Sequence, residues 1–124
     1  MPATYSTAVK NARLDAVTAA IGTTGVLEIG TAGMATVLAT IALGNPAAAA
    51  AASGVLTFSG FPRSDTSADA TGTPAAARVR TSSGGTDVVT GLTAGTSGTD
   101  VILDVSTITA GQKVDIASFT ITHA

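Results

Sequence analysis

The sequence contains no cysteine and no tryptophan, and it has a single histidine, three phenylalanines and one tyrosine. Without cysteine the chain can form neither disulfides nor thiolate metal sites, so packing alone must stabilise the fold. Charged residues make up 11% of the chain, against roughly 25% in an average soluble protein. We therefore expect a surface built mainly from threonine, serine, glycine and alanine.

Positive charge is too scarce for a nucleic-acid partner. The chain has six lysines and arginines and a net charge of −2, whereas binding to a phosphate backbone normally takes a clustered basic face. Long apolar runs are also missing: the longest, Met34–Leu43, is about half the ~20 residues that a membrane-spanning helix needs. The N-terminal residues lack the basic start and apolar stretch of a secretory signal, so we expect the chain to stay where it is made, without membrane contact.

The single histidine, His123, limits the chemistry, because histidine is the usual general base and the commonest metal ligand. We expect it to be an exposed residue at a strand end. Two carboxylate pairs, Asp65 with Asp69 and Asp100 with Asp104, could form an acid–base pair or part of a calcium site, but their spacing matches no calcium loop. We expect them to solvate loops and cap strand ends. The sequence therefore predicts a protein that is not an enzyme and holds no metal or cofactor.

Apolar residues recur at helical intervals near the N-terminus and predict a helix over residues 5–21, for which Gly22 is a suitable stop. They form two rows, Tyr5, Val9, Ala12 and Ala16 in one and Leu14, Val17 and Ile21 in the other. From residue 26 onward the pattern changes to period two, with β-branched residues and closely spaced turn signals. This change is typical of an all-β body.

The period-two pattern predicts strands at 26–29, 36–43, 54–58, 75–81, 87–92, 101–105 and 113–123. A bulge near Ser118 would bend the last strand and keep Phe119 and Ile121 on the core side. Hairpin turns are expected at 82–85 and 109–112. The segment 45–54 fits either a turn of helix capped by Asn45 or an irregular crossover.

The expected fold is therefore mainly β, a single domain over residues 1–124. It combines an antiparallel β-sandwich of about seven strands, spanning 26–123, with one N-terminal α-helix. No charged tail follows the C-terminal strand. We therefore expect this strand to pair into the sheet rather than to fray.

The sequence Phe61-Pro62-Arg63 lies in a long polar loop, 60–74, and in a chain with few aromatic residues. Phenylalanine and arginine are favoured anchors of protein interfaces. The alternative is that Phe61 folds back to cover one end of the sandwich. Together with Tyr5 of the N-terminal segment, Phe61 and Arg63 are the candidate partner-binding residues.

Several segments of the sequence point to a family. They are NARLDAVTAAI (11–21), LEIGTAGMATVLATIAL (27–43), GVLTF (54–58) and ARVRTSSGGTDVVTGLTAGTSGTDVILDVSTITAGQKVDIASFTITHA (77–124). In these segments the chain resembles small, mostly uncharacterised proteins encoded in the structural-gene region of tailed bacteriophages, typically close to the major capsid protein. The resemblance covers nearly the whole chain and implies a virion component, but it supplies no motif from which site residues transfer.

The first hypothesis is that this virion component is a head decoration or minor capsid protein that binds the capsid surface in many copies. Its partner would be the major capsid protein or another virion protein, and its location the virion, after assembly in the host cytoplasm. We also expect a homo-oligomer, because the sparse charge leaves strand edges little protected against pairing. The first alternative is a receptor-binding or fibre-attachment domain that uses its loops, and the second is an enzyme or enzyme inhibitor.

Overall fold

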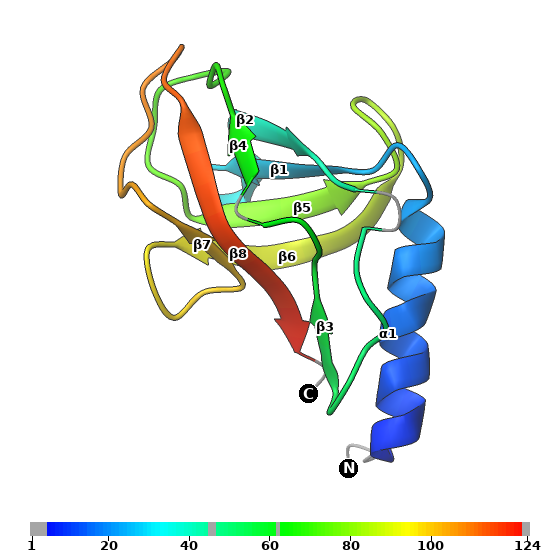
Figure 1. Ribbon diagram of the computed structural model, residues 1–124. Coiled ribbons are helices and arrows are strands. Elements are labelled where there is room, and N and C mark those ends of the chain that lie inside the picture. Colours follow the sequence, from blue (N-terminus) through cyan, green and yellow to red (C-terminus); the bar gives the residue numbers. More distant parts are fainter. Residues whose placement is uncertain (1–4, 45–46, 62, 123–124) are drawn as a thin grey trace.

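A helix lies beside a curled β-sheet in the computed structural model of the chain, which describes residues 5–44, 47–61 and 63–122 (Figure 1). The elements in chain order are α1 (Thr7–Ile21), β1 (Val26–Gly30), the 3-10 turn η1 (Ala32–Met34), β2 (Val37–Ala42), β3 (Val55–Thr57), β4 (Arg63–Asp65), β5 (Ala76–Arg80), β6 (Asp87–Gly95), β7 (Val101–Leu103) and β8 (Val114–Thr122). No helix within the described ranges has the length and apolar character needed to cross a membrane.

The strands form one sheet in the order β2-β1-β5-β6-β7-β8-β3, and β4 pairs with β8 beside this path. The prediction of a mainly β fold with an N-terminal helix is confirmed. The sheet is mixed rather than purely antiparallel, because Ala94 and Gly95 of β6 pair in parallel with Val101 and Ile102 of β7. The connection 96–100 loops back, so that the chain passes the end of β6 again in the same direction.

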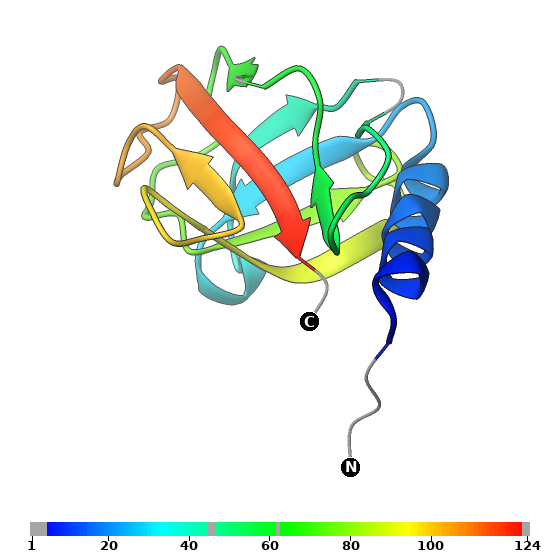
Figure 2. The same ribbon diagram turned by 60° about the horizontal axis from the view of Figure 1, so that its bottom comes forward.

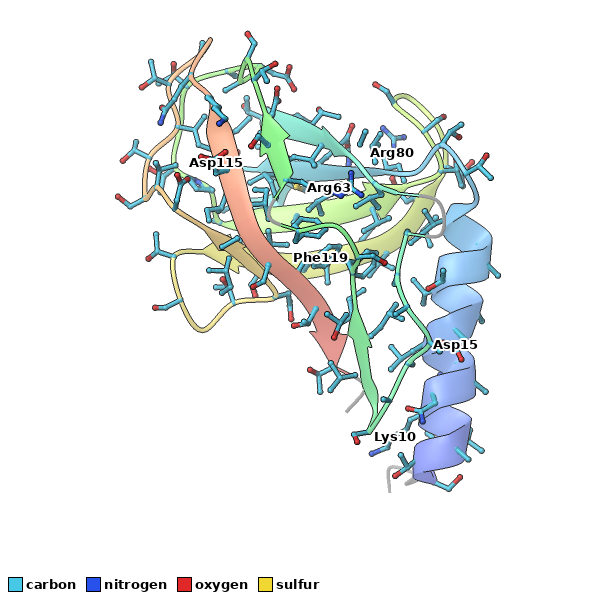
Figure 3. The ribbon with its side chains drawn as sticks, viewed as in Figure 1. Lys10, Asp15, Arg63, Arg80, Asp115 and Phe119 are labelled. Atoms are coloured by element: carbon cyan, nitrogen blue, oxygen red, sulfur yellow. The ribbon has the colours of Figure 1, made fainter. Side chains whose placement is uncertain are left out.

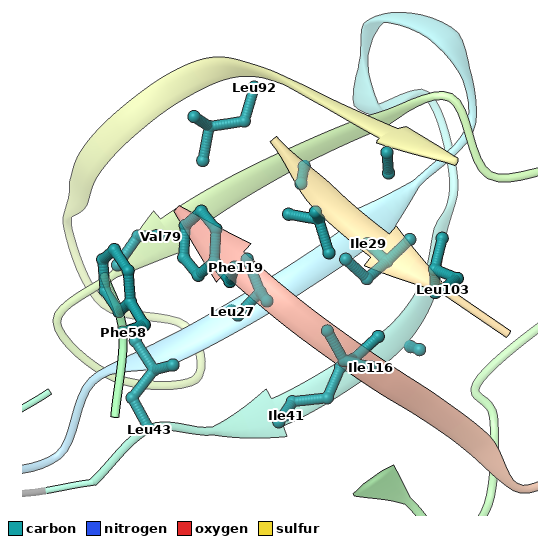
Figure 4. Packing of buried hydrophobic residues seen from close by; sticks show 14 of the residues in the cluster. Leu27, Ile29, Ile41, Leu43, Phe58, Val79, Leu92, Leu103, Ile116 and Phe119 are labelled. Carbon is teal, nitrogen blue, oxygen red and sulfur yellow. The ribbon is translucent and has the colours of Figure 1, made fainter. Parts of the chain in front are cut away.

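The core lies where β8 crosses over β1, β2 and β5 (Figure 4). Alternate residues of the strands point into it, as period two requires. The rings of Phe58 and Phe119 stack with their centroids 4.0 Å apart. The largest fully buried side chains come from α1, from most strands and from the loop before β8: Phe119, Ile21, Leu27, Ile29, Leu38, Ile41, Leu56, Leu103, Ile108, Ile116, Val79 and Val101.

The bulge predicted in the last strand is confirmed. Ile102 and Leu103 of β7 are consecutive, but their partners on β8 are Ser118 and Ile116, so Ala117 is an extra residue. A bulge shifts the alternation by one position. Phe119 and Ile116 are therefore both buried, although they are three positions apart and strict alternation would place them on opposite faces. The predicted extension of this strand to His123 lies outside the described residues.

Both turns expected from the sequence are present. Gly85 N–H donates to Ser82 O in the turn between β5 and β6, and Gln112 N–H donates to Thr109 O. The second turn does not join paired strands directly, because the preceding Ile108 bridges to Gly72 instead.

The described residues 47–54 form an irregular crossover with isolated bridges rather than a helical turn. Of the two alternatives for segment 45–54, the structure therefore favours the crossover. The proposed cap residue Asn45 and the neighbouring Pro46 lie outside the described residues.

The outer edge of β2 is covered by the segment 63–69. Asp65 Oδ2 accepts a hydrogen bond from Thr40 N–H at 2.9 Å, and Asp69 N–H donates to Leu38 O at 2.7 Å. The segment includes β4. This strand was not predicted from the sequence, because three polar residues are too few to show a period. It links β2 to β8 and so limits exposure of the sheet edge.

Candidate functional site

The two apolar rows of α1 have opposite environments. The inner row packs against the sheet and consists of Leu14, Val17 and Ile21, of which the first and last are buried. The outer row faces solvent and consists of Tyr5, Val9, Ala12 and Ala16. Tyr5 is 42% exposed and Val9 44% exposed, which makes them the exposed large hydrophobic residues of the described chain. The helix therefore presents an uncovered apolar face.

Hydrogen bonds fix which face of α1 turns outward. Asp15 Oδ1 accepts from Ala51 N–H at 2.8 Å, and Asn11 Oδ1 accepts from Gly54 N–H at 3.0 Å. Both acceptors tie the helix to the crossover segment before β3, beside which Asp15 lies in Figure 3. Because these bonds and the inner row fix the rotation of the helix, the outer row is held towards solvent.

Tyr5 lies against the helix that it precedes. The guanidinium carbon of Arg13 is 4.5 Å from the centroid of the Tyr5 ring, a cation–π contact. This contact extends the outer row by one aromatic ring at the start of the helix. The prediction that Tyr5 binds a partner stays a prediction, and the structure places it on an exposed apolar face.

Phe61 and Arg63 lie together, away from Tyr5. The Phe61 ring meets Phe119 edge to face, with centroids 6.3 Å apart, and the Arg63 guanidinium carbon is 5.9 Å from the Phe61 centroid. Half-buried Phe61 thus packs on the core, as the covering alternative describes. β4 and the N-terminal end of α1 lie at opposite ends of the molecule in two views (Figures 1 and 2), so the three candidate residues do not form one site.

Arg63 has structural partners of its own. Its Nε donates to Ser59 O at 3.3 Å and its Nη1 to Ala42 O at 3.4 Å. The second bond joins β4 to the edge of β2. Arg63 therefore holds the covering segment in place, and whether it also contacts a partner remains a prediction.

Three of the aspartates considered as acid–base pairs form hydrogen bonds with threonines. Asp65 and Asp69 both bond to Thr40, the first at its backbone N–H and the second at its hydroxyl. Asp100 Oδ2 accepts from the backbone and hydroxyl of Thr93. Thr40 lies within β2 and Thr93 within β6, so these three aspartates bond to residues inside strands rather than capping strand ends. Within the described ranges, no three histidine, cysteine, aspartate or glutamate side chains lie close enough to hold a metal ion.

Asp115 on β8 lies beside a hydroxyl group and an ammonium group. The Ser64 hydroxyl donates a hydrogen bond to its Oδ1, and Lys113 Nζ lies 3.5 Å from the same oxygen. The Ser64 bond, followed by the Lys113 charge, lowers the pKa of Asp115 below its ordinary value. Asp104, for which capping was expected, is exposed near this group.

A charged cluster that the sequence analysis missed lies on the outer face of β1 and β5. Glu28 is 5% exposed, and its Oε1 is 2.6 Å from Arg78 Nε and 3.9 Å from Arg80 Nη1. Arg80 Nε is in turn 3.0 Å from Asp87 Oδ1. A buried carboxylate needs such partners, because desolvation of an unpaired charge costs several kcal/mol. The signal was available, since Glu28 alternates with core residues and Arg78 and Arg80 flank the buried Val79.

A pocket of about 470 Å³ opens beside this cluster. Its walls come from η1, from the start of β5 and from the middle of β6. The lining consists mainly of small or apolar residues with one charged side chain: Ala32, Gly33, Met34, Ala75, Ala76, Arg78, Thr90, Gly91, Leu92 and Thr93. We call it the Arg78 pocket.

No protein-family model, curated protein or solved structure matches the chain. Two features of the described residues are candidates for function: the outer row of α1 and the Arg78 pocket.

Proposed function

We propose that the protein is a non-enzymatic structural component of a bacteriophage virion, a head decoration or minor capsid protein that binds the capsid surface in many copies. The observation that carries the proposal is the outer row of α1, where Tyr5 and Val9 are exposed while the other large apolar side chains of the described residues are buried or half-buried. The resemblance to proteins of the phage structural-gene region supplies the biological setting. The partner is the major capsid protein or another virion protein, met in the host cytoplasm during assembly.

Covering the outer row is energetically favourable. Complete burial of a large apolar side chain contributes about 1.5–3 kcal/mol. Tyr5 and Val9 are still exposed, so a partner that covers them would gain a large share of this free energy. The bonds from Asn11 and Asp15 already fix the helix, so little conformational freedom is lost on binding. Contiguous exposed apolar surface marks interaction sites, and Tyr5, Val9, Ala12 and Ala16 lie in one exposed row.

The small size of the face favours binding in many copies. A helix of 15 residues is about 22 Å long, and one row along it covers only part of the roughly 800 Å² that each partner contributes to a stable interface. Attachment to a repeating shell, or a homo-oligomer at one of its symmetry axes, adds contacts through multivalency. A decoration protein meets this requirement.

The alternative, a receptor-binding or fibre-attachment domain, assigns contact to the loops 60–74 and 93–100. The structure ties both loops down. Asp65 and Asp69 fasten the first to Thr40, and Asp100 fastens the second to Thr93. These bonds give the loops structural roles. We therefore favour the outer row of α1 over the loops as the contact surface.

The copy number of the protein in purified virions tests this proposal. Quantitative gel densitometry should find it in a copy number of the same order as the major capsid protein. A fibre domain would be present in far fewer copies, and an enzyme could be absent from the particle. Absence, or a copy number typical of fibres, would contradict the decoration assignment.

A further inference from the structure

The Arg78 pocket is pre-formed by the hairpin loop between β1 and β2. Thr31 N–H donates to Thr36 O at 3.0 Å, Thr36 N–H donates to the Thr31 hydroxyl at 3.0 Å, and Met34 N–H donates to Thr31 O at 2.8 Å. These bonds close the loop that carries η1. The resulting volume of about 470 Å³ falls in the range of pockets that hold small ligands or side chains.

Met34 forms the rim of the pocket in an uncommon backbone conformation. Its φ is 58°, a left-handed value that costs energy for a residue with a side chain. A Cβ at Gly30 would lie 2.8 Å from Met34 Sδ, so the absence of a side chain there lets the thioether lie over β1. Methionine adapts to varied apolar partners, and its strained placement points to a role at this rim.

A bend in β6 opens the opposite wall. Ala77 pairs with Leu92 and Val79 with Val89, so β6 contains one residue more than β5 between these two pairs. Gly91 takes a φ of 75° within the bend, and a Cβ built on it would meet no atom within 4 Å. The wall therefore contains no side chain at this point, which leaves space for a guest.

Arg78 supplies the polar chemistry of the pocket. Its Nε donates a hydrogen bond to Glu28 Oε1, whereas Nη1 and Nη2 donate none to another described residue. The side chain is 23% exposed. Arg80 is different, since it also forms an ion pair with Asp87 and its Nη2 donates to the carbonyl of Gly85. Arg78 therefore offers a planar pair of donor groups beside an apolar hollow, the geometry that matches a carboxylate.

We propose that the Arg78 pocket binds an extended acidic segment of a partner protein, with a small apolar side chain between Met34 and Leu92 and an adjacent Asp or Glu carboxylate on the free guanidinium nitrogens of Arg78. The proposal rests on the proposed function for the identity of the partner, a virion protein, but not for the binding chemistry. The charges of Glu28, Arg78, Arg80 and Asp87 balance, so the fit depends on directed hydrogen bonds rather than on net charge.

The test is an NMR titration of the ¹⁵N-labelled full chain with the peptide acetyl-valyl-aspartyl-valine amide. Binding should shift the amide signals of Gly33 and Gly91 and the Nε–H signal of Arg78. The asparaginyl analogue, which has the same shape without the charge, should bind about tenfold more weakly. Equal affinity for the two peptides, or shifts that leave these three signals unmoved, would overturn the proposal.

Two matched variants locate the binding site. Thr90 lines the pocket and is exposed, so Thr90→Phe should fill the hollow and abolish the shifts. Thr57→Phe places the same ring at an exposed position of β3 and should leave them unchanged. Arg78→Lys keeps a positive charge beside buried Glu28 but loses the planar fork, and it should weaken binding while the core signals stay in place. The peptide titration uses no virus particle. A peptide that fails to bind therefore does not contradict the decoration proposal, and an unexpected copy number in virions does not contradict peptide binding at the Arg78 pocket.

Discussion

Single polar residues in this protein mainly bond to backbone groups that strand pairing leaves open. Asp65 caps the N–H of Thr40, and Asn11 and Asp15 cap N–H groups of the crossover before β3. Each such bond contributes about 0.5–1.5 kcal/mol, and leaving a buried backbone group unpaired costs more. These polar side chains therefore stabilise the fold by bonding to backbone groups.

Asp115 gives a prediction at this scale. Its pKa is lower in the folded state because of the Ser64 bond first and Lys113 second, so the folded chain binds fewer protons than the unfolded chain. The carboxylate therefore stabilises the fold above about pH 4, and this contribution disappears as the pH falls below that value. Ser64→Ala should raise the pKa of Asp115 towards its ordinary value, as measured by NMR titration of the side-chain carboxyl.

The matched control is Ser83→Ala, which changes an exposed serine in the turn between β5 and β6. The pKa of Asp115 should stay low in this variant. An unchanged pKa in Ser64→Ala would mean that Lys113 alone causes the shift.

At the scale of elements, periodicity in the sequence predicted most helices and strands but not their surroundings. The bulge in β8 followed from the need to bury Phe119 and is present at Ala117. Both apolar rows of α1 are visible in the sequence, yet periodicity cannot say which row packs, because that depends on Asn11 and Asp15 reaching the distant residues 51 and 54.

Other elements left no readable signal. β4 is three polar residues long and forms because β8 and the edge of β2 lie on either side of it. The parallel pairing of β6 with β7 depends on the path of the loop 96–100, held by Asp100 and Thr93. The Arg78 pocket combines three separate segments, so no local motif marks it.

β8 carries the prediction for this scale, because β7, β3 and β4 all pair with it. Deleting residues 118–124 would remove the pairing of β3 and the stacking of Phe119 on Phe58. Loss of each large buried side chain costs about 1.5–3 kcal/mol against a total stability of about 5–15 kcal/mol. We expect no soluble folded protein, as judged by circular dichroism and expression level. A truncated chain with an unchanged melting temperature would show that β8 is dispensable.

The whole molecule is a curled sheet with few charges and largely covered edges. The segment 63–69 covers β2, and the crossover 47–54 lies between β3 and α1 (Figure 1). Association through strand edges, expected from the sequence, therefore receives less support from the structure than association through the outer row of α1. An apolar contact is weakly screened by salt, unlike a charge-steered one.

The most direct test of the assembly account is co-sedimentation of the purified protein with phage particles that lack it, at low salt and at about 1 M salt. We expect the wild type to pellet with the particles at both salt concentrations. Val9→Asp, which places a charge in the outer row, should remain in the supernatant, whereas Thr23→Asp, on the exposed turn after α1, should pellet as the wild type does. A wild-type protein that stays in the supernatant and sediments as a monomer at micromolar concentration would contradict the account, and so would equal pelleting of Val9→Asp.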